Sequence, residues 1–362
     1  MSRNMIEANK YIFNLLANFV ENQNIDVPIF RDAKRCIETN EDDKRWLQQV
    51  KIITEQSILP YFRTATFEFD NKNYFVAIGW QDKLELEQEI IEEIELNGGM
   101  VTALLFDLKV SVKQTANAYQ IANNILYLPE KDIIRYKFSE INHFFEPLFV
   151  YQINDKCPFV EIKSDIIKIA NVNLSAFYII QHRQIISLRF QKETLLVFER
   201  LFTEGVKVMQ YDTFENLLFS LVSVSWKHSF LDVYRCIERL FSISFWQEFY
   251  EGLEVKDSLL NFSAKIENYT DWRPQEKEAI NKLIDHAPEE AINLLREIKN
   301  DLYGNSEGKL GEFIYEIRNS IVHFRPATKP ISIDNQNWDK LIRACLLVIE
   351  CLYHQYEEML NK

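Results

Sequence analysis

The C-terminal part of the chain constrains the fold most, because its apolar residues recur at helical spacing. From about residue 210 onward no alternating strand pattern appears. Instead, large apolar side chains follow one another at steps of three and four, which is typical of a buried helix face. The clearest series is Trp226, Phe230, Val233, Ile237 and Phe241. The sequence therefore predicts an all-α domain over residues 210–362.

Proline and glycine divide this domain into shorter helices. Pro274 and Pro288 each stand where a helical pattern begins, with acidic residues close behind, and both features favour a helix N-terminus. Gly304 marks a helix end, and Ser306 is expected to cap the next helix. An amphipathic pattern over residues 337–360 predicts the last helix. Because the connections are short and polar, we expect a bundle of about five helices with antiparallel neighbours.

The first part, residues 1–205, mixes strand and helix patterns. Residues 4–22 carry a helical apolar stripe, and residues 65–80 alternate as two strands about an Asp-Asn-Lys-Asn turn, which predicts a hairpin. The other expectations are strands over 101–112 and 124–129, a helix over 130–149, and either structure over 177–190. The predicted fold class is therefore α+β, with a mixed domain followed by a helical bundle.

Composition excludes several classes of protein. Hydrophobic residues form 47% of the 362, enough for two cored domains. The chain shows neither an apolar run of bilayer length nor a secretory signal, so we expect a cytoplasmic protein with no membrane partner. The five cysteines form no CxxC pair, which argues against zinc and for reduced thiols. Without a GxxxxGK[ST] or GxGxxG motif, no cofactor is expected.

Charge restricts nucleic-acid binding. The formal net charge is −13, whereas proteins that grip long duplex DNA usually carry a basic excess. Binding would have to use a small cationic site, and the basic stretches 31–36 and 182–192 are too diffuse to predict one. No metal site is expected, because five of the histidines lack the spacing of metal ligands. These are His143, His182, His228, His286 and His354.

The stretch EIRNSIVHFRP, residues 316–326, places three polar groups at the end of an apolar helix. Pro326 disfavours helical geometry at the preceding residue, so the helix should stop near residue 324 with His323 in its last turn. A helix C-terminus stabilises a protonated imidazole. Arg318 lies five residues earlier, about 140° around the axis and about 7.5 Å along it, so the two side chains do not share a face.

Arginine and histidine without a metal suit the cleavage of RNA by its own 2′-hydroxyl. The histidine can take the 2′-hydroxyl proton or protonate the leaving 5′-oxygen. Arg318 can hold the phosphate oxygens in a bidentate fork and stabilise developing charge. Asn319 can position either group or donate to a phosphate oxygen.

Arg318, Asn319 and His323, on the penultimate helix of a C-terminal bundle, resemble the R-x4–6-H motif of the HEPN superfamily. The resemblance covers about residues 215–360. It implies a metal-independent endoribonuclease of prokaryotic conflict systems, such as toxins, abortive infection and anti-phage defence. It also implies a homodimer that joins two motifs in one composite site on RNA. Glu238, on the segment that resembles the family's first long helix, is the candidate supporting residue.

The resemblance leaves residues 1–205 unassigned. They are expected to sense a trigger, bind a regulatory protein or restrain the bundle. The alternative from another class is a non-catalytic HEPN module that dimerises or binds nucleotide, RNA or a protein partner. A third interpretation, with the enzyme in residues 1–205, has no supporting motif.

Each candidate residue also has a simpler explanation. His323 can cap the last carbonyl groups of its helix. Arg318 can pair with an acidic neighbour, and surface pairs of this kind contribute little. Glu238 can be a solvated or Arg-paired helix residue, and Tyr315, one turn before Asn319, can pack or touch substrate. If the Arg318 and His323 side chains point into a shared open cleft, the enzyme is favoured. If they are buried in ion pairs, the non-catalytic module is favoured.

Overall fold

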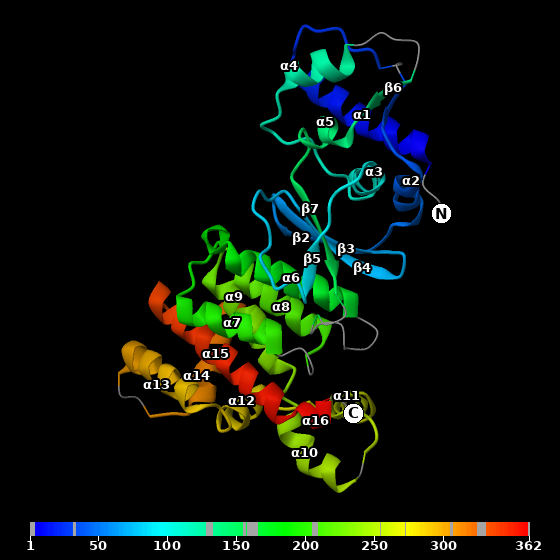
Figure 1. The fold of residues 1–362 in the computed structure, drawn as a ribbon. Helices are drawn as coiled ribbons and strands as arrows, with labels where there is room; N and C mark the ends of the chain where they lie inside the picture. The colour runs from blue at the N-terminus through cyan, green and yellow to red at the C-terminus, as the bar shows by residue number, and fades with distance from the viewer. Residues whose placement is uncertain are drawn as a thin grey trace. The chain divides into compact units, whose positions relative to one another are not determined.

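The chain folds into two compact units, Met1–Val160 (unit 1) and Glu161–Lys362 (unit 2), drawn in Figure 1. The structure is a computed structural model. It describes residues 4–31, 34–127, 133–154, 157, 166–204, 209–253, 255–271, 273–304, 307–323 and 331–360. All the strands described lie in unit 1, and unit 2 is described as helices and their connections. The fold class is α+β, as predicted.

Unit 1 is built on a five-stranded antiparallel sheet of order β2-β3-β4-β7-β5. The strands are β2 (Lys51–Leu59), β3 (Phe62–Phe69), β4 (Lys72–Ile78), β5 (Ile91–Glu93) and β7 (Leu148–Ile153). Phe69 pairs with Lys72, and the two turn residues, Asp70 and Asn71, have φ of 51° and 59°. Two successive left-handed residues make a type I′ turn, which matches the twist of paired strands. The predicted hairpin is confirmed.

Five helices and this sheet share the hydrophobic core of unit 1. The helices are α1 (Met5–Asn22), α2 (Glu41–Gln49), α3 (Gly98–Asp107), α4 (Ala118–Ile121) and α5 (Phe138–Asn142). Leu16 of α1, Leu104 of α3, and Phe67 and Val76 of the sheet all belong to one fully buried cluster. Each such side chain contributes roughly 1.5–3 kcal/mol when removed from water. The predicted helix over residues 4–22 is confirmed.

Helix α3 occupies much of the segment where a strand was predicted, so the expected strand over 101–112 is wrong. All residues from Gly98 to Leu105 are buried, which removes the polar face that would show helical periodicity in the sequence. The Asn97 side chain accepts from the Met100 amide at 2.8 Å and starts the helix. Gly99 is needed because a Cβ there would lie 1.7 Å from the main-chain oxygen of Asp43.

A second, parallel pair of strands joins β1 (Arg35–Ile37) to β6 (Ile134–Tyr136). The strand predicted over 124–129 is wrong where it is described, because residues 124–126 lie in the π-helical segment η1 (Ala122–Leu126). The helix predicted over 130–149 is also wrong, since of its described residues only α5 is helical. Short apolar runs of this kind do not distinguish strand from helix.

The described part of unit 2 is all-α. Its long helix α15 contacts α7, α9 and α13 (Figure 1). The helices of unit 2 are α6 (Ile166–Gln181), α7 (Lys192–Glu204), α8 (Tyr211–Val222), α9 (Trp226–Glu238), α10 (Ile243–Gly252), α11 (Leu259–Thr270), α12 (Glu276–Ile284), α13 (Glu289–Tyr303), α14 (Leu310–Val322), α15 (Asn335–Gln355) and α16 (Glu357–Leu360). The structure thus describes nine helices after residue 210, several of them short, against the expected five or so.

The predicted domain boundary at 205–210 falls within unit 2, about 45 residues after the observed division. Helices α6 and α7 precede that boundary but pack on α8 and α15, which follow it. The ambiguous segment 177–190 begins in α6 and continues through a single 3-10 turn, η2 (Arg183–Ile185). Its first residues therefore belong to the bundle rather than to a sheet.

The predicted helix ends agree with the structure where it describes them. Pro288 is the residue that immediately precedes α13, and Gly304 follows its end with φ of 66°. Pro274 lies two residues before α12, whose first turn carries Glu276 and Glu278. Ser306, the expected cap, lies outside the described residues.

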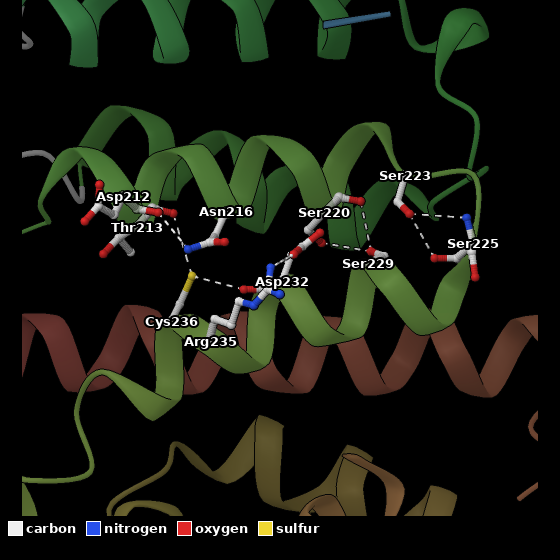
Figure 2. Close-up of polar contacts among 10 residues, drawn as sticks. All are labelled: Asp212, Thr213, Asn216, Ser220, Ser223, Ser225, Ser229, Asp232, Arg235 and Cys236. Atoms are coloured by element: carbon white, nitrogen blue, oxygen red, sulfur yellow. Dashed lines mark hydrogen bonds and ion pairs between the residues drawn. The ribbon is translucent and has the colours of Figure 1, made fainter. Parts of the chain in front are cut away.

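Polar contacts fix α9 against α8 (Figure 2). The Ser229 hydroxyl donates to the main-chain oxygen of Ser220 at 2.9 Å and lies 2.8 Å from the Ser220 hydroxyl. In the last turn of α9, the Cys236 thiol lies 3.7 Å from the main-chain oxygen of Thr213. These contacts set the position of α9, which carries Tyr234 and Glu238 beside α12 and α14.

Candidate functional site

The polar motif lies at the C-terminal end of α14. Phe313, Ile314 and Ile317 bury one face of this helix, which packs against α12 and α9. Arg318 and Asn319 follow the buried Ile317 and are half-buried. The helix ends at Val322, so His323 lies one residue past the last turn, with φ of −104° and ψ of 97°.

Arg318 is held between two carboxylates and an amide. Its Nη1 lies 3.2 Å from Glu276 Oε2, and its Nη2 lies 3.8 Å from Glu238 Oε1. Nη1 also donates to Asn319 Oδ1 at 3.0 Å. With 17% of the side chain exposed, Arg318 is mostly covered by these groups. Of the two possibilities that the sequence leaves open, the Arg318 side chain adopts the ion-paired one.

Aromatic rings complete the surroundings of Arg318. The guanidinium carbon lies 5.7 Å from the centre of the Tyr234 ring, within the range of a cation–π contact. The Tyr234 hydroxyl is buried and has no hydrogen-bond partner among the described residues. Burial raises the pKa of Tyr234, with a further contribution from the charge of Glu276. Tyr315 is half-buried and also interacts electrostatically with Tyr234.

The two carboxylates, Glu238 and Glu276, repel each other electrostatically in this site. Burial raises the pKa of Glu238, and the charge of Glu276 raises it further, whereas Arg318 opposes both effects. Glu276 Oε2 is buried and accepts no aligned hydrogen bond from any described residue, despite its short distance to Arg318. One cation therefore faces two anions, and the arrangement retains a negative surplus when both carboxylates are ionised.

His323 is placed differently from Arg318. Its main-chain amide donates to the Asn319 oxygen at 2.9 Å, which closes the last turn of α14. The residue is exposed, and its ring makes no hydrogen bond or ion pair with any residue that the structure describes. An exposed imidazole at a helix C-terminus is accessible to a substrate. Pro326, the expected stop signal, lies outside the described residues.

Among the predicted residues, Glu238, Arg318 and Asn319 therefore lie together, with Tyr315 close by. The structure gives no contact between the side chains of Arg318 and His323 within one chain. Sequence reasoning missed Tyr234 and Glu276. Glu276 was visible only as an acidic residue near a helix start, and Tyr234 only as a member of an apolar pattern.

The chemistry available here is that of a cation, an amide and an imidazole near one helix end. A guanidinium held by carboxylates can exchange one of them for a phosphate, because both anions accept the same bidentate fork. Within the described parts of the chain, no group of three or more His, Cys, Asp or Glu is placed to hold a metal ion. No described helix has the length and apolarity that crossing a bilayer requires.

Comparison with known proteins found no match to a family model, to a curated protein or to a solved structure.

Proposed function

We propose that the chain is a metal-independent endoribonuclease that cleaves RNA through attack of its own 2′-hydroxyl. The observation that carries this proposal is the grouping of Arg318, Asn319 and Glu238 beside a helix end that presents His323 to solvent. The resemblance of these residues to the HEPN motif supports the same function. The chain would then act in the cytoplasm as an effector of anti-phage defence or of a toxin–antitoxin pair.

In this mechanism His323 exchanges protons and Arg318 holds the phosphate. The imidazole takes the proton of the attacking 2′-hydroxyl or gives one to the leaving 5′-oxygen. The guanidinium stabilises the charge that grows on the phosphate oxygens. Asn319, whose Oδ1 accepts from Arg318, keeps the guanidinium oriented. The products carry a 2′,3′-cyclic phosphate and a 5′-hydroxyl.

A homodimer supplies the geometry that one chain lacks. Within one protomer the side chains of Arg318 and His323 make no contact with each other. A two-fold axis near the end of α14 would place the His323 ring of one protomer near the Arg318 side chain of its partner, since a two-fold contact repeats one surface on both subunits. We therefore assign the complete site to two protomers, with unit 1 free to bind a trigger or a regulatory protein.

Expression in a bacterial host tests the proposal. Induction of the wild-type chain should slow growth and fragment cellular RNA, whereas His323→Ala should do neither. The matched control is His354→Ala, because His354 is also exposed and near a helix C-terminus. Fragmentation that persists in His323→Ala and in wild type alike would refute the role of this imidazole.

A second candidate function is favoured by the ion pairs of Arg318. An arginine mostly covered by Glu238 and Glu276 is also what a purely structural bundle would contain. In that case the helices form a non-catalytic HEPN module that dimerises or binds a partner. Arg318→Ala would then reduce the stability of unit 2, and neither Arg318→Ala nor His323→Ala would change any RNA.

A further inference from the structure

Unit 1 contains a cavity of about 670 Å³ between α1 and the strands β1 and β6. Its walls come from described residues of segments far apart in the sequence: between Met5 and Ala17, Arg31, between Lys34 and Lys44, Leu126, and Ile133 with Arg135. The volume lies within the range of roughly 300–1,000 Å³ that is typical of small-ligand sites. The proposed nuclease site in unit 2 uses none of these residues.

The charge of the lining is opposite to the charge of the chain. The sequence holds 54 acidic and 41 basic residues, yet the described residues that line this cavity include no Asp or Glu. Six of them are cationic: Lys10, Arg31, Lys34, Arg35, Lys44 and Arg135. The basic residues of the stretch 31–36 were too diffuse in the sequence to predict a site. In the fold, Arg31, Lys34 and Arg35 line the cavity together with cationic residues of α1, α2 and β6. Such a concentration of positive charge in a concave surface attracts anions.

Three of these cations are available to a ligand. Arg31 pairs with Glu21, and Lys44 pairs with Glu41. In contrast, Lys10, Lys34 and Arg135 are exposed and form no ion pair with any residue that the structure describes. Their charges must be balanced by water, by salt or by a bound anion.

Arg35 holds the walls in place. It is 8% exposed, and its guanidinium donates to the main-chain oxygens of Ile125, Phe30 and Leu126 at 2.8, 2.6 and 2.8 Å. These three bonds tie β1 to the C-terminal end of η1 and to the segment at Phe30, beside the cavity. A cavity with fixed walls loses little entropy when a ligand binds, which favours small-molecule recognition.

The remaining lining is apolar and suits a flat organic group. Phe13, Ile37 and Leu126 are buried side chains that line the cavity, and Ile6 and Ile133 stand at it with 77% and 53% of their surface exposed. Together they give a ligand in the cavity an apolar surface to cover, as in most small-molecule sites.

We propose that this cavity binds a nucleotide, with its phosphates against Lys10, Lys34 and Arg135 and its base and ribose against the apolar wall. A nucleotide combines the two chemistries of the lining within the observed volume. A long RNA is less well suited, because it would extend beyond the cationic lining onto a chain whose net charge is −13. The inference is independent of the proposed nuclease.

Isothermal titration calorimetry on the full chain tests the proposal, with ATP, GTP, CTP and UTP as separate probes. At least one should bind with one-to-one stoichiometry. Charge reversal by Lys34→Glu or Arg135→Glu should weaken that binding by about tenfold or more, as expected for loss of a hydrogen bond to a charged group. Lys51→Glu is the matched control, because Lys51 is exposed in unit 1 but does not line the cavity.

Circular dichroism checks that each variant is folded like the wild type. If a charge-reversal variant does not fold, Lys34→Gln or Arg135→Gln, which only neutralises the charge, takes its place. Failure of all four probes to bind at about 1 mM overturns the proposal, as does binding that neither pair of variants weakens. If a single-stranded RNA oligonucleotide binds with the same dependence on Lys34 and Arg135 while the nucleotides do not, the cavity belongs to an RNA surface and the proposal is wrong.

Discussion

Replacing Arg318 by methionine removes the positive charge between Glu238 and Glu276 and keeps most of the apolar length of the side chain. The Arg318 side chain is 17% exposed and those of its partners are 40% and 36% exposed, so the cluster lies between a surface and a buried site. Exposed pairs contribute about 0–1 kcal/mol, and removal of one member of a buried pair costs about 3–5 kcal/mol. We expect a loss of roughly 1.5 kcal/mol in the free energy of unfolding near neutral pH.

The loss should depend on pH in a defined direction. The pKa of Glu238 is raised, mainly by burial, and Arg318 opposes that rise. A carboxyl whose pKa is higher in the folded state binds protons better when folded, so its contribution to stability grows as pH falls through the raised pKa. Without Arg318 the pKa of Glu238 rises further. Arg318→Met should therefore be most destabilised near neutrality and approach the wild type in acid.

Thermal unfolding followed by circular dichroism measures this effect. For a unit of about 200 residues, the expected loss corresponds to a decrease in Tm of roughly 3–6 °C at about pH 7.5. The decrease should shrink at about pH 5.5. Adding Glu276→Gln to Arg318→Met should recover part of the loss, because one of the two facing carboxylates is then neutral. An equal decrease at both pH values, together with no recovery in the double variant, would show that the charges of Glu238 and Glu276 do not cause the loss.

Three further predictions concern the fork, the dimer and the core of unit 1. Arg318→Lys should cleave RNA at least about tenfold more slowly than wild type in initial-rate assays, since an ammonium cannot form the bidentate fork; an equal rate would remove phosphate binding from Arg318. Mixed Arg318→Ala and His323→Ala protomers, each inactive alone, should regain part of the wild-type rate, because a mixed dimer keeps one intact Arg318 and one intact His323 on opposite protomers; no recovery would contradict a site shared in this way. Gly99→Ala should lower the stability of unit 1 by roughly 1–3 kcal/mol in denaturant unfolding, because its Cβ would meet the main-chain oxygen of Asp43 at 1.7 Å. Gly252→Ala, with nothing within 4 Å, is its control.

Local signals in the sequence predicted those elements whose causes are local. The hairpin at Asp70 and Asn71 follows from residues that tolerate positive φ, and the bounds of α13 follow from Pro288 and Gly304. Helix α14 ends at Val322, two residues before the predicted end near residue 324, so the approximate end was predicted but His323 follows the last turn instead of lying in it. These signals act within a few residues, so they can be read without knowledge of the fold.

Features that depend on the surroundings could not be read in this way. Helix α3 is buried on all sides, so its sequence shows no polar face and resembles a core strand. The division between the units could not be located, because α6 and α7 reveal their association with α8 and α15 only through packing.

The candidate site was predictable in part for the same reason. Arg318, Asn319 and His323 are neighbours in sequence, whereas Glu276 approaches Arg318 from another helix, 42 residues earlier. The cationic cavity of unit 1 likewise collects side chains from residues 10 to 135, and no single stretch of the sequence shows it.

The chemical ends of the products show whether His323 takes part in cleavage of RNA by its own 2′-hydroxyl. Purified wild-type chain and His323→Ala would be incubated with cellular RNA in buffer that contains EDTA, and the 5′ ends of the fragments would be identified. We predict 5′-hydroxyl ends from the wild type and no fragments from His323→Ala. Fragments with 5′-phosphate ends would exclude attack by the 2′-hydroxyl, and equal cleavage by the two proteins would exclude a role for His323.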